Sequence, residues 1–139
     1  MQFLTTQITT TIEKCDEALK PIAQCVQTAF DDVTAMTGAL TGYLMSAAQN
    51  PGEIYKVGLG SVRYLLAVGD LLIGWRLLAQ ADIATRALVN GTGHDEAFYR
   101  GKIATAGFFA KNMLPQLSSL RGVIEAIDDE IMNVAEEAF

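Results

Sequence analysis

The sequence predicts an all-α protein, an up-down bundle of three long helices that forms a single domain over residues 1–139. Three observations predict this fold class. Apolar residues recur every three or four positions along almost the whole chain, whereas no segment alternates with the two-residue period of a half-buried strand. Clusters of turn-forming residues divide the pattern at residues 50–53 and 90–93. With 139 residues, of which 50% are hydrophobic, the chain can bury one sizeable core.

The first predicted helix covers residues 8–47. Its apolar residues alternate in steps of four and three, which is the heptad spacing of a buried seam. Pro21 lies beside this seam, and a proline inside a helix costs about 3 kcal/mol because a hydrogen bond is lost. The apolar phase continues across Pro21, so we favour one long helix kinked at Pro21 over a helix broken there. The seam consists of Ile8, Ile12, Cys15, Leu19, Ile22, Val26, Ala29, Val33, Met36, Leu40, Tyr43 and Ala47.

The second predicted helix begins at Pro51, where Asn50 is placed to cap it and Glu53 stands at the third helical position. Glycines within this helix lower its propensity but allow a neighbouring backbone to approach closely. The helix shows two apolar stripes, so we expect neighbours packed against two of its faces. One stripe is Leu65, Val68, Leu72, Trp75, Ala79 and Ile83, and the other is Leu59, Val62, Leu66, Ile73, Leu77, Ala84 and Leu88.

The third predicted helix follows a turn at residues 90–93, in which a glycine can take the left-handed position that ends a helix. Thr92 or Asp95 can cap the helix that follows. From Phe98 the apolar pattern continues to Ala138, and Pro115 is expected to bend this helix without ending it.

An antiparallel hairpin of the second and third helices, centred near Thr92, would place residues equally far from that point at the same level. Trp75 lies seventeen residues before Thr92, and Phe109 lies seventeen residues after it. Aromatic side chains bury large areas in such seams. We therefore expect Trp75 to pack in the core against Phe108 or Phe109.

Charged residues on the same two helices should also meet. By the register of the hairpin, Asp82 should face Lys102, and Asp70 should lie near the level of Lys111. Because a buried charge needs a partner, ion pairs between the helices are the main interpretation of these residues.

Composition argues against several partners. Sixteen acidic and ten basic residues leave a net charge of −6, which disfavours nucleic acid and anionic membranes. The most apolar stretch, residues 64–79, is interrupted by Asp70 and Arg76, so we interpret it as a buried helix and not as a membrane span. Residues 1–5 lack the features of a signal peptide, and Cys15 and Cys25 lie too far apart on one predicted helix for a disulfide. We therefore expect free thiols and a cytoplasmic location.

No set of residues predicts a catalytic, cofactor-binding or metal site. His94 is the single histidine and stands in a turn, whereas zinc sites, di-iron bundles and catalytic triads need further partners. The acidic cluster at residues 128–130 is typical of a solvated helix end. One alternative stays open: Tyr99, Arg100 and Lys102 could contact an anionic ligand such as a CoA phosphate, because arginine offers a bidentate fork and lysine a point charge.

Four segments together resemble a known family. They are the run from Tyr64-Leu65-Leu66 to Gly74-Trp75, the segment Phe98-Tyr99-Arg100-x-Lys102-x-Ala104-x-Ala106-x-Phe108-Phe109-Ala110, the pair Leu114-Pro115, and the closing Ala138-Phe139. This pattern resembles the C-terminal helical domain of long bacterial FAD-dependent acyl-CoA dehydrogenases, the acetyl-CoA dehydrogenase-like C-terminal domain. The first fifty residues match it only in being helical. Asp70 departs from the pattern, since a hydrophobic residue is expected there.

The resemblance implies a larger enzyme that uses FAD to introduce a 2,3 double bond into an acyl-CoA thioester. The flavin site and the catalytic carboxylate would lie outside this chain, so no cofactor is expected within it. The chain would then be a non-catalytic accessory domain that packs on the catalytic body or on a neighbouring subunit of a homo-oligomer. Phe98, Tyr99, Arg100 and the acidic C-terminal end are the expected docking residues. The alternative is a stand-alone helical bundle that acts as a protein-interaction module.

Overall fold

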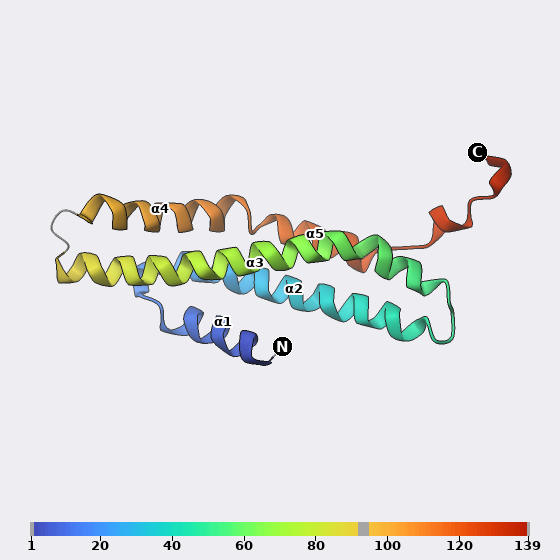
Figure 1. The fold of residues 1–139 in the computed structure, drawn as a ribbon, viewed down its shortest axis with the longest axis horizontal. Coiled ribbons are helices and arrows are strands. Elements are labelled where there is room, and N and C mark those ends of the chain that lie inside the picture. The colour runs from blue at the N-terminus through green and yellow to red at the C-terminus, as the bar shows by residue number, and fades with distance from the viewer. Residues whose placement is uncertain (1, 92–94, 139) are drawn as a thin grey trace.

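The computed structural model describes residues 2–91 and 95–138, and Figure 1 shows them as an elongated bundle of helices. No strand occurs in these residues, so the all-α prediction is confirmed. The elements are α1 (Gln2–Lys14), the 3-10 turn η1 (Glu17–Leu19), α2 (Lys20–Ser46), α3 (Glu53–Asn90), α4 (Glu96–Asn112), α5 (Gln116–Glu125) and the 3-10 turns η3 (Glu130–Asn133) and η4 (Glu136–Ala138).

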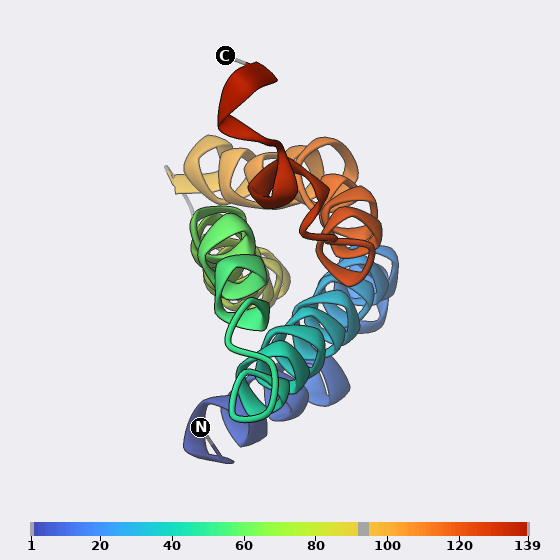
Figure 2. The same cartoon turned by 90° about the vertical axis from the view of Figure 1, so that its right-hand side faces the viewer.

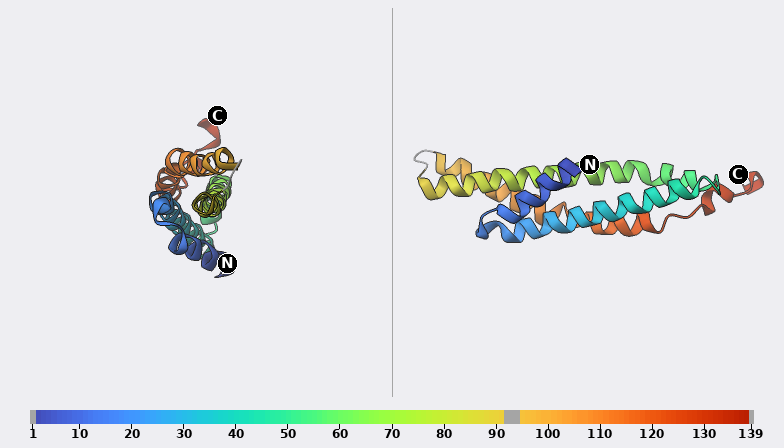
Figure 3. Two further views of the ribbon diagram at one scale, coloured as in Figure 1. Left: turned by 90° about the vertical axis from the view of Figure 1, so that its left-hand side faces the viewer. Right: turned by 90° about the horizontal axis from the view of Figure 1, so that it is seen from below.

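The long helix α3 runs the length of the bundle, and the other helices are arranged around it (Figure 1). α2 runs antiparallel to α3 on one side, and α4 followed by α5 runs antiparallel to it on another. Figure 2 looks along the bundle and shows these three columns, and Figure 3 shows α1 crossing obliquely beside α2 and α3. The up-down-up order is as predicted. The number of helices is not, because the first and the third predicted helices are each divided in two.

The first predicted helix is two helices that meet in a turn before Pro21. α1 ends at Lys14, and Asp16 then caps η1 by accepting a hydrogen bond from the Ala18 N–H at 2.9 Å. Pro21 lies in the first turn of α2, where its missing N–H breaks no helical hydrogen bond. The favoured prediction of one helix kinked at Pro21 is therefore wrong, and the alternative of a broken helix is correct, with the break just before Pro21. The continuous apolar phase misled because α1 turns back and buries its own apolar residue, Ile8, in the same core.

The third predicted helix is divided at Pro115. α4 ends at Asn112 and α5 begins at Gln116, so the helix ends and restarts instead of bending. Proline has no N–H to donate to the preceding turn, which favours such a break. α5 ends at Glu125, although the apolar periodicity continues to Ala138. The segment that follows forms the short 3-10 turns η3 and η4 and not a continued α-helix, so the predicted helix at the C-terminal end is wrong. Neither turn contains a buried residue.

The predicted turn chemistry is confirmed at the C-terminal end of α3 but not at its N-terminal end. Gly91 closes the helix at a φ of +83°, a conformation that favours glycine. At the other end Gly52 is the N-cap and no side chain caps the helix, so the predicted cap by Asn50 is wrong. The Asn50 side chain instead accepts a hydrogen bond from the Gly52 N–H at 3.3 Å within the turn before the helix. The helix begins at Glu53, two residues later than predicted.

α3 meets the core along a line of residues that lies mostly between the two predicted stripes. Small side chains are frequent on this line, which lets α2, α4 and α5 approach closely. Members of both stripes are instead exposed in the first half of the helix, among them Val62, Leu65 and Leu66. The prediction that both stripes are covered by neighbours is therefore wrong for the first half of the helix, whereas Val68, Leu72 and Trp75 of the first stripe do pack against the core. The buried residues are Gly60, Ala67, Leu71, Gly74, Leu78, Ala81 and Ala84.

Among the described residues, α3 is also the helix that is long and apolar enough to cross a membrane, with a mean hydropathy of 1.5 over its most apolar window. This is weak support for a membrane span, because core helices of soluble bundles have the same composition, and α3 packs on α2 and α4. Only 22% of that window is buried, however. The first half of α3 therefore keeps an uncovered apolar side.

Candidate functional site

Trp75 is bonded to α1. Its indole N–H donates a hydrogen bond to Thr11 Oγ1 at 2.8 Å, and the ring is half-buried against the core. Phe109 is also half-buried, but Phe108 is 65% exposed, so the predicted core position is wrong for Phe108. Trp75 and Phe109 both pack against the common core, and a direct contact between their rings stays a prediction.

Asp82 holds the turn between α1 and α2. One carboxylate oxygen accepts a hydrogen bond from the Asp16 N–H at 2.9 Å, and the other lies 2.8 Å from the Arg86 guanidinium. The Lys102 ammonium donates instead to Gln80 Oε1 at 3.1 Å. The predicted ion pair between Asp82 and Lys102 is therefore wrong. The register of α3 and α4 was nearly right, but Asp82 lies on the side of α3 that meets the α1–α2 turn.

The segment from Phe98 to Lys102 forms the first turns of α4. The rings of Phe98 and Tyr99 meet edge to face with centroids 5.5 Å apart, and the Lys102 ammonium lies 5.3 Å from the Phe98 centroid. Arg100 pairs with Glu96 at 2.7 Å. Both cations therefore have partners within the chain. The alternative of a contact with a CoA phosphate is not tested by these contacts and stays open.

Asp70 and Lys111 do not form an ion pair in the described structure. Asp70 is half-buried on α3, and Lys111 is exposed in the last turn of α4. Their predicted common level therefore produces no contact between the two charges.

The sequence patterns did not predict the polar cluster around Asp32. Asp32 on α2 is only 5% exposed. Its carboxylate accepts a hydrogen bond from Ser118 Oγ at 2.6 Å and lies 3.5 Å from the Arg121 guanidinium, and both partners belong to α5. Arg121 also binds Glu125 at 2.8 Å, and the two carboxylates, Glu125 more than Asp32, raise the pKa of the guanidinium. Because every charge here has a neighbour of opposite sign, the cluster joins α2 to α5 and leaves no free acid or base.

Both cysteines are free, as predicted. Cys15 is buried at the end of α1, and its thiol donates a hydrogen bond to the Ile12 carbonyl at 3.3 Å. Burial raises the pKa of this thiol. A raised pKa keeps the sulfur protonated at neutral pH, so Cys15 is a poor nucleophile.

An apolar groove lies between α1, α2 and α3, with a volume of about 730 Å³. Leu4 and Thr5, at the N-terminal end of α1, form one wall, and the second half of α2 and the first half of α3 form the others. None of its lining side chains is charged. The hydroxyls of Thr37 and Tyr64 in its wall bond each other at 2.8 Å, so the groove presents mainly hydrocarbon.

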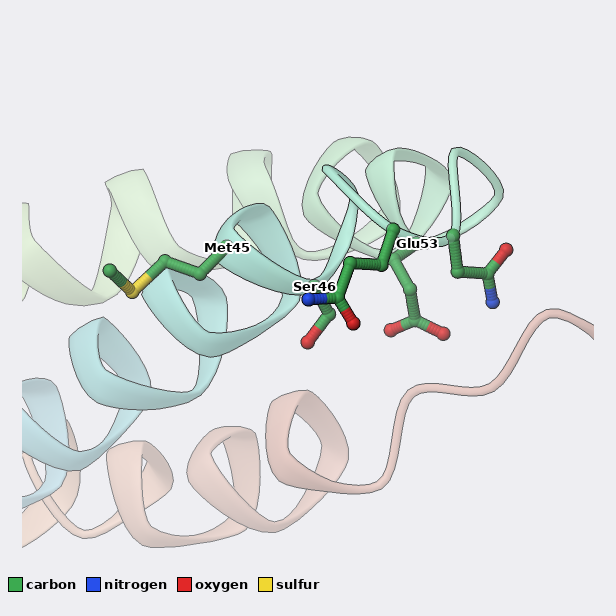
Figure 4. Close-up of a pocket in the computed structure, with 5 residues that line it drawn as sticks. Met45, Ser46 and Glu53 are labelled. Carbon is green, nitrogen blue, oxygen red and sulfur yellow. The ribbon is translucent and has the colours of Figure 1, made fainter.

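A second hollow, of about 490 Å³, lies at the turn between α2 and α3 (Figure 4). Figure 4 shows Ser46 and Glu53 directed toward the open space, whereas Met45 points away along α2. The Glu53 carboxylate is paired with Lys56 at 2.8 Å. This hollow is shallow and open, so it offers little to hold a ligand.

The described residues offer no side-chain cluster for a metal, and the apolar groove does not fit a flavin. No three His, Cys, Asp or Glu side chains within them lie close enough together to hold a metal ion. The pyrophosphate of FAD needs cationic side chains or a row of free backbone N–H groups, and the apolar groove offers only uncharged side chains. The expectations for His94 and Thr92 fall outside the described residues.

Comparisons with known proteins agree with one another. A family model described as acetyl-CoA dehydrogenase C-terminal like matches residues 4–135. The chain is 57% identical over 112 residues to the broad-specificity linear acyl-CoA dehydrogenase FadE5 of Mycobacterium tuberculosis, a match covering 80% of this chain and 18% of that protein. It is 33% identical over 101 residues to the 3-methylmercaptopropionyl-CoA dehydrogenase of Ruegeria pomeroyi, which covers 73% of this chain and 16% of that protein.

A third relative is the butyryl-CoA dehydrogenase of Syntrophomonas wolfei, 35% identical over 94 residues, which are 66% of this chain and 15% of that protein. The chain thus spans less than a fifth of the length of the curated relatives it matches.

Proposed function

Because the chain belongs to the acetyl-CoA dehydrogenase C-terminal-like family, we propose that it is the accessory C-terminal domain of a flavin-dependent acyl-CoA dehydrogenase. In this role it carries out no chemistry itself and packs on the catalytic body or on a neighbouring subunit of a homo-oligomer. The observation that carries the proposal is the extent of the match. The family covers residues 4–135, whereas each relative continues far beyond the matched part.

Oxidation of an acyl-CoA is the function of the whole enzyme in this proposal. The three relatives are named for acyl-CoA substrates that differ from one another, so the acyl group stays open. In this proposal FAD and the catalytic carboxylate belong to the body. We propose the cytoplasm as the location.

The apolar exposure of α3 supports a packing role. Monomeric soluble proteins rarely expose large contiguous apolar patches, and such patches mark interaction sites. The exposed side chains include Val62 at 66%, Leu65 at 69% and Leu66 at 64%. If the rest of an enzyme covers this surface, these apolar side chains are removed from water.

Excision of the region from the full-length enzyme tests the proposal. The shortened enzyme should still bind FAD, and it should have a lower Tm or a higher KM for acyl-CoA, because a packing partner is lost. The purified chain alone should be colourless and should oxidise no acyl-CoA with any electron acceptor. Stoichiometric FAD binding with turnover by the chain alone would contradict the proposal. An excised enzyme with unchanged Tm and KM would contradict it too.

A stand-alone interaction module is the second candidate, and the self-contained core favours it. Nineteen buried residues, contributed by α1, α2, α3, α4, α5 and the segments between them, form one hydrophobic cluster, so the chain has what it needs to fold alone. The reading frame upstream of residue 1 discriminates between the candidates. A dehydrogenase frame in phase supports the accessory domain, and a separate start site supports the module.

A further inference from the structure

The exposed apolar residues of α3 are concentrated in its first half and share one side of the helix. Most of them recur at steps of three or four, which keeps them on one face. We call them the α3 surface: Tyr55, Leu59, Val62, Leu65, Leu66 and Ile73. Gly58 and Gly69 lie between them, and an added Cβ at either position would meet no atom within 4 Å. The surface is therefore both apolar and unobstructed.

The α3 surface is continuous with the apolar groove. Leu65 of the surface stands three and seven residues before Val68 and Leu72, which line the groove, so it shares their side of the helix and borders the groove. Between residues 57 and 75 the helix carries two charged residues, Arg63 and Asp70. By helical geometry both lie at the edge of the surface that is away from the groove. An apolar centre with a charged edge is the usual composition of a protein interface.

The end of α1 indicates which partner covers this area. In the FadE5 relative more than four fifths of the polypeptide lies outside the match, because the match is only 18% of its length. The family is described as C-terminal, so in such an enzyme the preceding polypeptide joins at the N-terminal end of α1. Leu4 and Thr5 at that end form a wall of the groove. The preceding polypeptide therefore arrives beside the groove.

We infer that the catalytic body of the enzyme docks on the α3 surface and in the adjoining groove. The inference rests on the proposed function and names the surface through which it acts. It replaces Phe98, Tyr99 and Arg100 as the docking residues, because the start of α4 lies at the opposite end of the bundle from the first half of α3 (Figure 1). Those residues also have partners within α4.

Thiol labelling of single cysteine variants tests the inference. Leu66→Cys lies on the α3 surface, and Phe108→Cys is a matched control on α4, because the native side chains are 64% and 65% exposed. Each variant is made in the isolated chain and in the full-length enzyme, and circular dichroism confirms its fold. Maleimide labelling is read by mass spectrometry of the peptide that contains the new cysteine, which separates it from Cys15 and Cys25. Val62→Cys repeats the measurement in case Leu66→Cys fails to fold.

Docking should slow the labelling of Leu66→Cys about tenfold or more in the enzyme, since a covered thiol reacts only when the interface opens. Phe108→Cys should label within about twofold of its rate in the isolated chain. Equal rates for Leu66→Cys in both proteins would overturn the inference. A rate in the isolated chain that falls as its concentration rises would assign the surface to a second copy and also overturn it. If excision destabilises the enzyme while Leu66→Cys stays reactive, the proposed function stands and this docking surface is wrong.

Discussion

Asp32 shows how a single carboxylate can decide the packing of two helices. It is buried on α2, and its short hydrogen bond comes from the Ser118 hydroxyl on α5, whereas the Arg121 guanidinium is farther away. A buried carboxylate that lacks donors costs free energy, because its hydration is not replaced. Ser118 therefore matters more to this cluster than its small size suggests.

Replacing Ser118 by alanine should lower the free energy of unfolding by about 1–3 kcal/mol, the cost of leaving a buried acceptor short of a donor. In an Asp32→Ala background the same replacement should change it by less than about 0.5 kcal/mol, because the acceptor is gone. Urea denaturation of the four proteins measures both effects. Ser119→Ala, at an exposed neighbouring position on α5, is the control and should stay within about 0.5 kcal/mol. Additive effects of Asp32→Ala and Ser118→Ala would contradict the coupling.

Asp82 and Lys102 should behave as independent residues. Asp82→Ala removes the acceptor of the Asp16 N–H and should lower the free energy of unfolding by about 0.5–1.5 kcal/mol. Lys102→Ala breaks a separate hydrogen bond to Gln80. The double variant should equal the sum of the single variants to within about 0.5 kcal/mol in a denaturant titration. A larger coupling energy would show that Asp82 and Lys102 interact directly, and it would contradict their independence.

At the scale of the elements, prolines and glycines set the helix boundaries and the distances between helices. Pro21 and Pro115 lie at the starts of α2 and α5 and not inside longer helices. Gly74 lets Leu114 pack directly on α3, since a Cβ there would lie 2.9 Å from Leu114 Cδ1. Gly69, little more than one turn earlier, has no atom within 4 Å of that position. Gly74 is therefore required for close packing of α3 on Leu114, whereas Gly69 has space for a side chain.

The two glycines give a matched pair of variants. Gly74→Ala should lower the free energy of unfolding by about 1–2 kcal/mol, because overpacking against the buried Leu114 exceeds the gain of about 1 kcal/mol in helix propensity. Gly69→Ala in the isolated chain should raise it by up to about 1 kcal/mol, because only the propensity changes. Thermal unfolding followed by circular dichroism measures both. Equal stability of the two variants would show that Leu114 moves aside at little cost.

At the scale of the whole molecule, α1 is tied to the bundle through its middle and its C-terminal end. Ile8 is buried in the common core, Trp75 bonds Thr11, and Asp82 bonds Asp16 just beyond the helix. These contacts make α1 part of one cooperative unit. The same unit leaves the α3 surface uncovered.

Unfolding should therefore be a single transition in the isolated chain. Trp75 is the single tryptophan, so its fluorescence reports the docking of α1, whereas far-ultraviolet circular dichroism reports all helices. The midpoints of the two signals in urea should coincide, as two-state unfolding requires. A fluorescence midpoint at lower urea would show that α1 detaches before the rest of the bundle unfolds.

The candidate site was predictable only in part. The seam placed Val33 correctly in the core, and Asp32 beside it was a signal that a carboxylate lies near a buried face. Nothing local identifies Ser118, 86 positions away, as its partner. The register predicted for α3 and α4 was accurate to about one turn. That accuracy cannot decide which side of α3 Asp82 occupies, because one residue along a helix turns the side chain by about 100°.

The sequence by itself determined the all-α class, the turns near Asn50 and Gly91 and the resemblance to the family, and these are confirmed. Such features follow from helical periodicity, turn chemistry and motif identity, which act over short stretches of chain. Only the tertiary structure decided that the first helix breaks before Pro21, because an unbroken heptad seam is compatible with either a kinked helix or two helices sharing a core. It also decided which sides of α3 are buried. The apolar residues of α3 occupy more than one face, and their spacing does not show which face is buried. The neighbouring helices therefore determine which side is left for a partner.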